Sequence, residues 1–308
     1  MHELVGVLAA SASSSLGGTA IGATRYIAGA VDPVTLGALR FLQGTVLLLP
    51  LVLVGRAPWP PLRDWPRVIV LGLLFFALFP VLFNLALTMT TAARGALSLS
   101  TMPLLTMVAG ALLGIERPSL RKVQGVALAL GGVALAMTAG LDTAPPGAWR
   151  GDLVMIAAAA CGALFNVFSR PAIARSGVLP FITMAMGAGG LCLAAIAWAA
   201  GGFGRLAHLD APALAAVAYL GVVGSALIFW LWAVALARTT PTKVALSVTL
   251  NPVSAGIVGA FLLDEPLGLP LILGLAAILC GIALASRDRT ETPMPAPNAA
   301  ASSRRSAA

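Results

Sequence analysis

Long, uninterrupted apolar runs follow one another along most of the chain, and most of the breaks between them carry Pro, Gly or charged residues. A helix of about 20 apolar residues crosses the hydrocarbon core of a bilayer. In lipid such a run must satisfy its own backbone hydrogen bonds, which a helix does. We therefore predict ten membrane-spanning helices, at residues 4–24, 34–54, 67–88, 92–114, 121–139, 152–170, 178–201, 212–236, 242–263 and 270–286.

Both ends of the chain depart from this pattern. The first run lacks the positively charged start of a cleaved signal peptide, because His2 and Glu3 precede it, so we expect it to remain as a helix. Residues 287–308 contain no apolar run and are rich in Ala, Ser, Pro and Arg. Such a composition is typical of disorder, and we predict a disordered tail there.

Composition agrees with a polytopic, all-α membrane protein. Of the 308 residues, 59% are hydrophobic and 10% are charged, whereas soluble domains carry about 25% charged residues. The hydrophobicity excludes a disordered chain, and the lack of alternation disfavours a β-barrel. The net charge of +8 forms no basic stripe, so we expect no nucleic-acid partner.

The basic residues predict the orientation of the chain in the membrane. With the N-terminus inside, 14 Lys and Arg fall in inner loops and the tail, four fall in outer connections, and Arg40 lies within a span. Because positive charge gathers on the cytoplasmic side, we expect both termini to be cytoplasmic, in a bacterial-type inner membrane.

The chain also contains an internal repeat. Residues 91–136 and 240–285 align without a gap at a shift of 149 residues, with 17 of 46 positions identical. Each copy holds five predicted spans, and because five is odd the second copy enters the membrane upside down. Inverted repeats are a common build of secondary transporters, whose binding site lies near the midplane between the repeats.

Matched residues in the two halves carry a family resemblance. Each half ends in Ala-Leu, small residues, a mid-helix Pro, a Glu and a Gly-rich last helix. These features are Ala86-Leu87, Pro103, Glu116, Gly125 and Gly132 in the first half, and Ala235-Leu236, Pro252, Glu265, Gly274 and Gly281 in the second. Over residues 1–286 the chain resembles the EamA-type members of the drug/metabolite transporter superfamily. The resemblance implies two repeats, at 1–140 and 150–286, around a central cavity, in a carrier that is often an exporter of amino acids or related metabolites.

Two mid-span prolines are the first candidates for a binding site. Pro103 and Pro252 occupy matched positions, and a helical proline leaves the carbonyl four residues earlier without its usual donor. Matched breaks of this kind point to a binding site in transporters; a plain packing kink is the alternative.

Polar side chains near these breaks extend the candidate site. Asn251 and Ser247 share a face of the ninth span, and Ser98 and Thr101 share a face of the fourth. The further candidates are Asn84, Asn166, Ser11 and Ser15. The alternative for these residues is hydrogen bonding or close packing between helices.

Arg40 and Trp230 complete the set of candidates. Arg40 is the one basic residue placed inside a span, and it could pair with a substrate carboxylate; snorkelling of its long side chain to the interface is the alternative. Trp230 could stack on a ligand or belong to an interfacial aromatic belt. We expect spans 1, 3, 4, 6, 8 and 9 to line the cavity.

The predicted spans lack acidic residues at depth, and this limits the kinds of transport that the sequence favours. All 11 Asp and Glu lie near span ends, in loops or in the tail, which disfavours a carrier of cationic drugs built on a central carboxylate. We expect no cofactor, no metal and no enzymatic activity, and the partners are a small-molecule substrate and membrane lipid. Export of an amino acid or related metabolite is favoured by the resemblance; hydrophobic cations, nucleotide sugars, a lipid-modifying membrane enzyme and a non-transporting scaffold remain as alternatives. The oligomeric state, monomer or homodimer, stays open.

Overall fold

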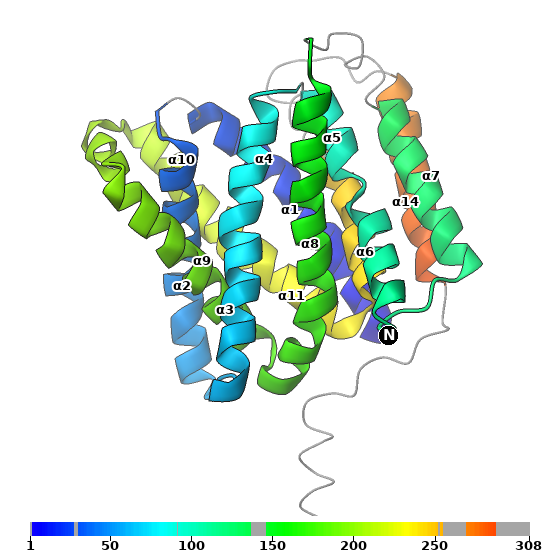
Figure 1. Ribbon diagram of the computed structural model, residues 1–308, viewed down its shortest axis with the longest axis horizontal. Coiled ribbons are helices and arrows are strands. Elements are labelled where there is room, and N and C mark those ends of the chain that lie inside the picture. Colours follow the sequence, from blue (N-terminus) through cyan, green and yellow to red (C-terminus); the bar gives the residue numbers. More distant parts are fainter. Residues whose placement is uncertain are drawn as a thin grey trace, which may run out of the picture.

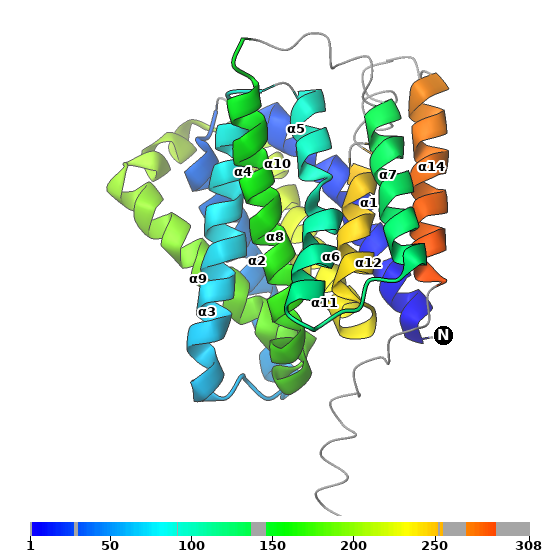
Figure 2. The same cartoon turned by 45° about the vertical axis from the view of Figure 1, so that its right-hand side comes forward.

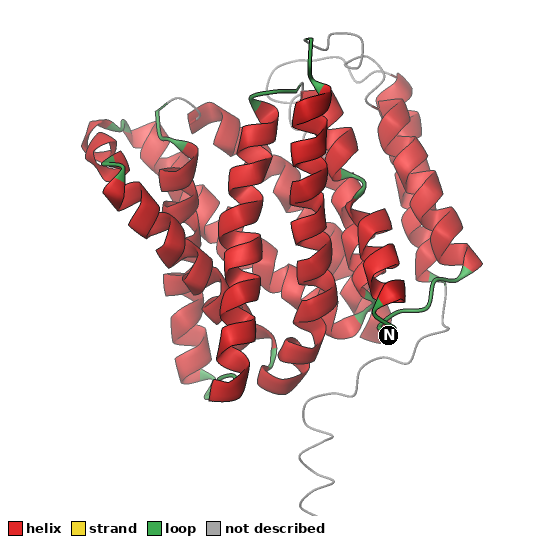
Figure 3. Cartoon of the chain, in the orientation of Figure 1, coloured by secondary structure: helices red, strands yellow, loops and turns green. Residues whose placement is uncertain are grey.

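The structure, a computed structural model, describes residues 2–27, 30–90, 92–136, 146–251, 253–254 and 269–287. These residues form helices joined by turns, and no strand occurs among them (Figure 3). The sequence-based predictions for Pro252, Glu265 and residues 288–308 fall outside this part of the chain.

Helices lie within all of the predicted spans. The first half contains α1 (His2–Ile27), α2 (Pro33–Val54), η1 (Leu62–Asp64), α3 (Trp65–Leu73), η2 (Leu74–Leu78), α4 (Phe79–Leu87), α5 (Ala92–Leu99), α6 (Met102–Leu112) and α7 (Leu120–Ala136). The second contains α8 (Trp149–Ser176), α9 (Val178–Ala199), η4 (Gly202–His208), α10 (Ala211–Gly221), η5 (Val222–Leu227), α11 (Ile228–Arg238), α12 (Pro241–Leu246), η6 (Ser247–Leu250) and α14 (Leu269–Ser286). Figure 1 shows most of them running roughly side by side.

Five continuous helical stretches of the described chain are long and apolar enough to cross a membrane. They are Pro33–Val54, Leu62–Leu87, Trp149–Ser176, Val178–Ala199 and Ala211–Arg238. Leu97–Leu112 and Ile272–Ser286 are shorter apolar helical stretches. The fold is therefore that of an all-helical, multi-pass membrane protein.

Asp32 fixes where α2 begins. Its carboxylate accepts hydrogen bonds from the backbone N–H groups of Val34 (3.1 Å) and Thr35 (2.9 Å), and Pro33 occupies the first helical position. Burial would raise the pKa of Asp32, but the hydrogen bonds from Thr35 and Val34 outweigh it and lower the pKa below its ordinary value. The cap thus favours the ionised side chain.

The last helices of the two halves, α7 and α14, pack closely and antiparallel along one edge of the molecule (Figures 1 and 2). A Cβ added at Gly125 would lie 2.6 Å from the carbonyl oxygen of Gly281, and one added at Gly132 would lie 2.7 Å from that of Gly274. Larger side chains do not fit at these crossings, since small residues are what allow helix backbones to approach. Gly125 matches Gly274 in the repeat and Gly132 matches Gly281, so exchanging the halves maps this contact onto itself.

A second pair of matched helices, α2 and α9, packs in the same manner. Gly37 lies against Leu193, while Gly187 lies against Thr45 further along α2. The order of contacts is reversed along the two helices, so they too are antiparallel. Two self-matched antiparallel pairs place the two halves about an approximate two-fold axis.

The two halves share an irregularity within their third helical run. In each, one π-helical segment interrupts the α-helix, at η2 (Leu74–Leu78) and at η5 (Val222–Leu227). The shift of 149 residues maps η2 onto Val223–Leu227, so the two segments coincide. Single-turn π segments leave backbone groups unpaired and occur often at functional sites. This coincidence identifies the surroundings of η2 and η5 as a place to look for a site.

Candidate functional site

A cavity of about 250 Å³ lies between the halves, beside both π-helical segments. Its polar lining comes from Ser13, Ser14, Thr24, Arg40, Asn84 and Asn251, and its aromatic lining from Phe41, Phe75, Phe79, Phe83, Phe229 and Trp232. Neither carboxylate, imidazole nor thiol occurs among the lining residues, and the described residues contain no group of His, Cys, Asp and Glu that could hold a metal ion. The cavity can bind a small organic molecule by polar and aromatic contacts.

The helices around the cavity differ from the expected set in two cases. Helix α2 contributes several lining residues, among them Pro33, Gly37 and Arg40, although its span was not expected to line the site. No residue of α8, which corresponds to the sixth predicted span, is among the lining residues. The reason for the second difference lies in Asn166, described below.

Helix α1 presents a different polar face from the one the sequence predicted. Ser13, Ser14, Gly17 and Thr24 line the cavity, whereas Ser11 is half-buried away from it and Ser15 is exposed. Ser13 Oγ donates to the carbonyl oxygen of Ile228 at 2.8 Å. The face of α1 that lines the cavity is therefore displaced by about two residues from the predicted face.

Asn251 contacts the cavity, as the sequence analysis proposed for a binding residue. Its Oδ1 atom is buried and accepts no hydrogen bond from the described residues, and Gly17 makes room for it: a Cβ on Gly17 would lie 3.0 Å from Oδ1. Ser247, one turn earlier, does not reach the cavity, because its Oγ lies 2.8 Å from Ser14 Oγ and also donates to the carbonyl oxygen of Val244. Pro252 is outside the described residues.

The predicted break at Pro103 separates two helices. Helix α5 ends at Leu99, and α6 begins at Met102 with Pro103 in its first turn. Thr101 Oγ1 closes the junction by donating to the carbonyl oxygen of Ser98 at 2.6 Å. Pro103, Ser98 and Thr101 are not lining residues; Leu99 and Met102, on either side of the junction, are.

Asn166 on α8 is fully buried behind the cavity wall. Its Oδ1 accepts a hydrogen bond from Trp232 Nε1 at 2.9 Å, and its Nδ2 points to the sulfur of Met102 at 4.0 Å. Trp232 and Met102 both line the cavity, so Asn166 supports the wall from behind. Trp230, the predicted stacking residue, is 38% exposed and faces away, and Trp232 takes the place at the cavity.

Asn84 and Arg40 both line the cavity, as expected for binding residues. Asn84 lies in α4, one turn after Pro80, which also lines it. Arg40 Nη2 donates to the carbonyl oxygen of Gly224 at 2.8 Å, and its Nε donates to Ser225 Oγ at 3.3 Å. Both acceptors belong to η5, so Arg40 of the first half is joined to the π-helical segment of the second.

The cavity extends toward one face of the bundle. Among its lining residues, Thr24 is near the end of α1, Pro33 begins α2 and Leu87 ends α4, and these three helix ends share a face. Toward the face that carries the N-terminus, the lining stops near Ser13, Phe41 and Phe75. The described lining thus reaches one face of the bundle and stops short of the other.

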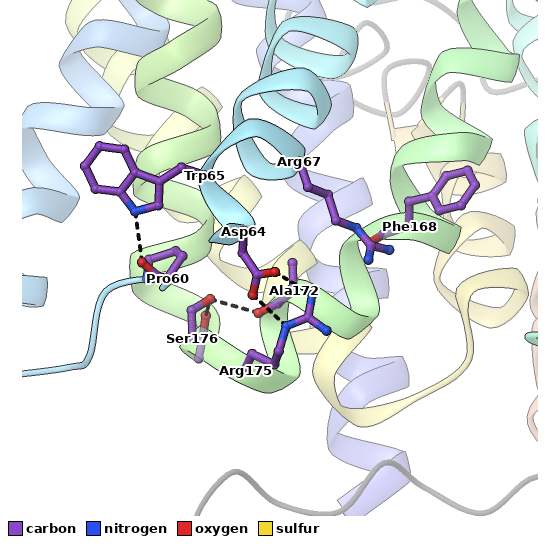
Figure 4. Close-up of polar contacts among 9 residues, drawn as sticks. Pro60, Asp64, Trp65, Arg67, Phe168, Ala172, Arg175 and Ser176 are labelled. Atoms are coloured by element: carbon purple, nitrogen blue, oxygen red, sulfur yellow. Dashed lines mark hydrogen bonds and ion pairs between the residues drawn. The ribbon is translucent and has the colours of Figure 1, made fainter. Parts of the chain in front are cut away.

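Polar contacts join the two halves at the face that carries the N-terminus. Arg175 pairs with Asp64 through Nε (2.7 Å) and Nη2 (3.2 Å), and Arg67 donates to the carbonyl oxygen of Phe168 at 3.1 Å (Figure 4). Lys243, at the start of α12, pairs with Glu3 of α1. These contacts join residues of the first half to residues of the second.

A buried ion pair lies at the same face. Glu116 is almost fully buried, with its Oε1 2.9 Å from Lys122 Nζ, and its Oε2 accepts a hydrogen bond from the backbone N–H of Thr242 at 3.2 Å. A carboxylate of the first half therefore caps α12 of the second. The sequence identified Glu116 as a residue matched between the two halves, but it did not predict that Glu116 and Lys122 are both buried.

Known proteins share both the sequence pattern and the fold. A protein of Pseudomonas aeruginosa, named only as uncharacterized, is 33% identical over 260 residues, which cover 83% of this chain and 84% of its own. A probable terminal-alkyne amino-acid exporter of Streptantibioticus cattleyicolor is 29% identical over 226 residues, 71% of this chain and 74% of its own. One solved structure, called only the crystal structure of a protein, has a TM-score of 0.74 at 23% identity, covering 92% of this chain and 97% of its own, and this likeness concerns the fold.

The family model of the EamA-like transporters matches the chain twice, over residues 4–138 and 149–287. Together the two matches take in both halves of the helical bundle and the cavity between them. The chain belongs to the EamA-like transporter family.

Proposed function

We propose that the protein is a ten-helix secondary transporter that moves a small polar organic solute across the bacterial inner membrane by alternating access. The cavity carries this proposal: it lies between two antiparallel halves, its described lining extends toward one face, and contacts between the halves join them at the opposite face. A rocking motion of the halves would break these contacts and bring the halves together at the other face.

The proposed topology places both termini in the cytoplasm, with the second half inverted. The bias of 14 basic residues against four supports the orientation, and the antiparallel pairs α2–α9 and α7–α14 support the inversion. In this orientation the described lining of the cavity extends toward the outer face. Reporter fusions after residues 118 and 289 should be cytoplasmic, and fusions after 146 and 266 periplasmic; the same side for 118 and 266 would contradict the inverted repeat.

Export of an amino acid or related metabolite is the favoured activity. The similarity to a probable terminal-alkyne amino-acid exporter supports this substrate class. The test is growth of cells with and without the gene on toxic amino-acid analogues, followed by flux of the protective analogue in proteoliposomes. Gene-dependent resistance together with outward flux is the expected result. If the protein transports another solute but no amino acid, the proposed substrate class is wrong.

The contact residues proposed for the solute are Asn251, Asn84 and Arg40 directly, with Asn166 acting through Trp232. Asn251→Ala removes an acceptor that no described residue satisfies. The loss of one hydrogen bond costs about 1–3 kcal/mol when its partner is left bare, or a roughly 5- to 150-fold higher half-saturation concentration. Ser15→Ala, on the exposed face of α1, is the matched control and should change nothing. Equal half-saturation concentrations for the two variants would show that the solute does not bind at Asn251.

A further inference from the structure

Arg40 brings a positive charge into the cavity, and no carboxylate of the described part of the chain lines the cavity with it. Its guanidinium has five N–H donors, and within the described chain two of them are used, toward Gly224 and Ser225. Both N–H groups on Nη1 are among the remaining three. A charged group at membrane depth is costly unless it is paired, and no acidic residue is among the described residues that line this cavity.

The two halves differ at the positions that flank this charge. The repeat matches Arg40 with Gly189, and it matches Ser225 of η5 with Phe76 of η2. Gly189 lies directly against Phe76, with the position of an added Cβ overlapping that side chain. Where one half places a guanidinium against its partner's π-helical segment, the other places a glycine against the backbone and Cβ of Phe76.

Aromatic side chains that line the cavity pack against further aromatic rings. The Phe75 ring is stacked on that of Phe165 with centroids 4.4 Å apart, and the Phe76 and Phe229 rings meet edge to face at 4.8 Å. Phe75, Phe79 and Phe229 line the cavity. Trp232 adds its ring but not its N–H, which is already donated to Asn166. This wall offers aromatic surface and no hydrogen-bond donor.

An acceptor and the residue that binds Arg40 contact α1 at positions three residues apart. Gly17 of α1 contacts Asn251 Oδ1, and Ala20 of α1 contacts Gly224, which holds Arg40 Nη2. Three residues of helix correspond to about 4.5 Å along its axis. A carboxylate at Arg40 and a neighbouring donor of the same small molecule can therefore reach both groups.

From these contacts we infer that the solute carries a carboxylate on an apolar body, and that it binds with the carboxylate on Arg40 and the apolar part on the phenylalanines. This inference rests on the proposed transport function and narrows its substrate. Carboxylate and guanidinium form paired, charge-assisted hydrogen bonds, while aromatic rings attract apolar groups and a carboxylate gains nothing from them. Because only one half carries the charge, the solute binds in one orientation.

Four probes with the same phenyl body test the inference on the purified full-length protein. They are 3-phenylpropanoate (anion), phenylalanine (zwitterion), 2-phenylethylamine (cation) and 2-phenylethanol (neutral). Binding is measured as the probe-dependent rise of the unfolding temperature. The two carboxylates should bind more tightly than the alcohol, and the amine should bind most weakly, because it meets Arg40 with a like charge.

Variants of Arg40 separate binding from a purely structural role. Arg40→Gln should weaken 3-phenylpropanoate roughly 10- to 150-fold, the value of a hydrogen bond to a charged group, and leave the alcohol unchanged. Arg121→Gln, which removes an exposed charge on α7, is the control and should bind all four like the parent. If Arg40→Gln does not fold, the probe order on the unmodified protein decides alone.

The outcomes for the anion and for transport are distinct. Tighter binding of the amine than of the carboxylates, equal binding of 3-phenylpropanoate by Arg40→Gln and the parent, or binding of none of the four would each overturn the inference. Counterflow in proteoliposomes is recorded separately with the same probes. Carboxylates that bind without crossing the membrane would refute the transport function while supporting the carboxylate site. Flux of the amine alone would support the transport function and refute the carboxylate site.

Discussion

Replacing Gly132 by Ala measures how tightly α7 and α14 are packed. The new Cβ would lie 2.7 Å from the carbonyl oxygen of Gly274, whereas ordinary contacts begin at 3.4 Å, so the helices must separate by about 0.7 Å, the difference of these two distances. Overpacking of this kind costs about 1–3 kcal/mol. Ala also favours a helix over Gly by about 1 kcal/mol, which partly hides the cost.

Gly131 provides the control for that helix-propensity gain. It is the neighbouring residue in α7, it is exposed, and an added Cβ would meet nothing within 4 Å. The propensity terms cancel between the two variants, so Gly132→Ala should be less stable than Gly131→Ala by the overpacking cost alone, about 1–3 kcal/mol. Gly281→Ala, the repeat match of Gly132, should behave like Gly132→Ala, because its Cβ would lie 2.6 Å from the carbonyl oxygen of Gly125.

The assay is reversible unfolding of the purified protein in mixed micelles, followed by circular dichroism over a denaturing-detergent titration. Equal stability of the Gly132→Ala and Gly131→Ala variants would refute the close crossing, and with it the self-matched contact between the two halves. A large loss for Gly132→Ala with none for Gly281→Ala would refute the symmetry while retaining the crossing.

Two further predictions concern charges at the ends of helices. Lys122→Met leaves the buried Glu116 carboxylate without its cation, so the free energy of unfolding should fall by about 3–5 kcal/mol; adding Glu116→Gln should restore part of it, and a double variant no more stable than the single one would contradict the pairing. The folded state lowers the pKa of Asp32, so its stabilising effect is present above the unfolded pKa of about 3.9 and is lost as pH falls through the folded value. Asp32→Asn keeps the cap without titrating, and the unfolding temperature of the parent should therefore fall faster than that of this variant below about pH 4; parallel curves would exclude the linkage.

The repeat could be recognised in the sequence because its helix crossings and helix breaks require particular residue types. Glycines at helix crossings and prolines at helix breaks keep their positions when the surrounding apolar residues exchange freely. The match of Gly125 with Gly274 and of Gly132 with Gly281 predicted the two halves, and the structure brings these four residues together. Arg40 was conspicuous for a similar reason, because a charge inside a span is rare.

The orientation of individual side chains was harder to predict. Helix α1 carries small and polar residues on several sides, so spacing alone did not distinguish the face of Ser11 and Ser15 from that of Ser13 and Gly17. Trp230 and Trp232 follow the π-helical segment η5, and the extra residue of a π turn rotates every later side chain around the helix axis. Asn166 was predicted as a candidate binding residue, with hydrogen bonding between helices as the alternative, and the sequence did not reveal its hydrogen bond with Trp232.

The contact between α7 and α14 has the form of an interface between two copies of one subunit, since exchanging the halves maps it onto itself. In a symmetric dimer every substitution occurs twice, and an arginine at position 40 would bring two guanidinium groups to one cavity. Joining both subunits in a single polypeptide lifts that constraint. A single chain can therefore carry Arg40 in one half and Gly189 at the matched position of the other. The helices around the cavity stay symmetric, while the binding site itself is asymmetric.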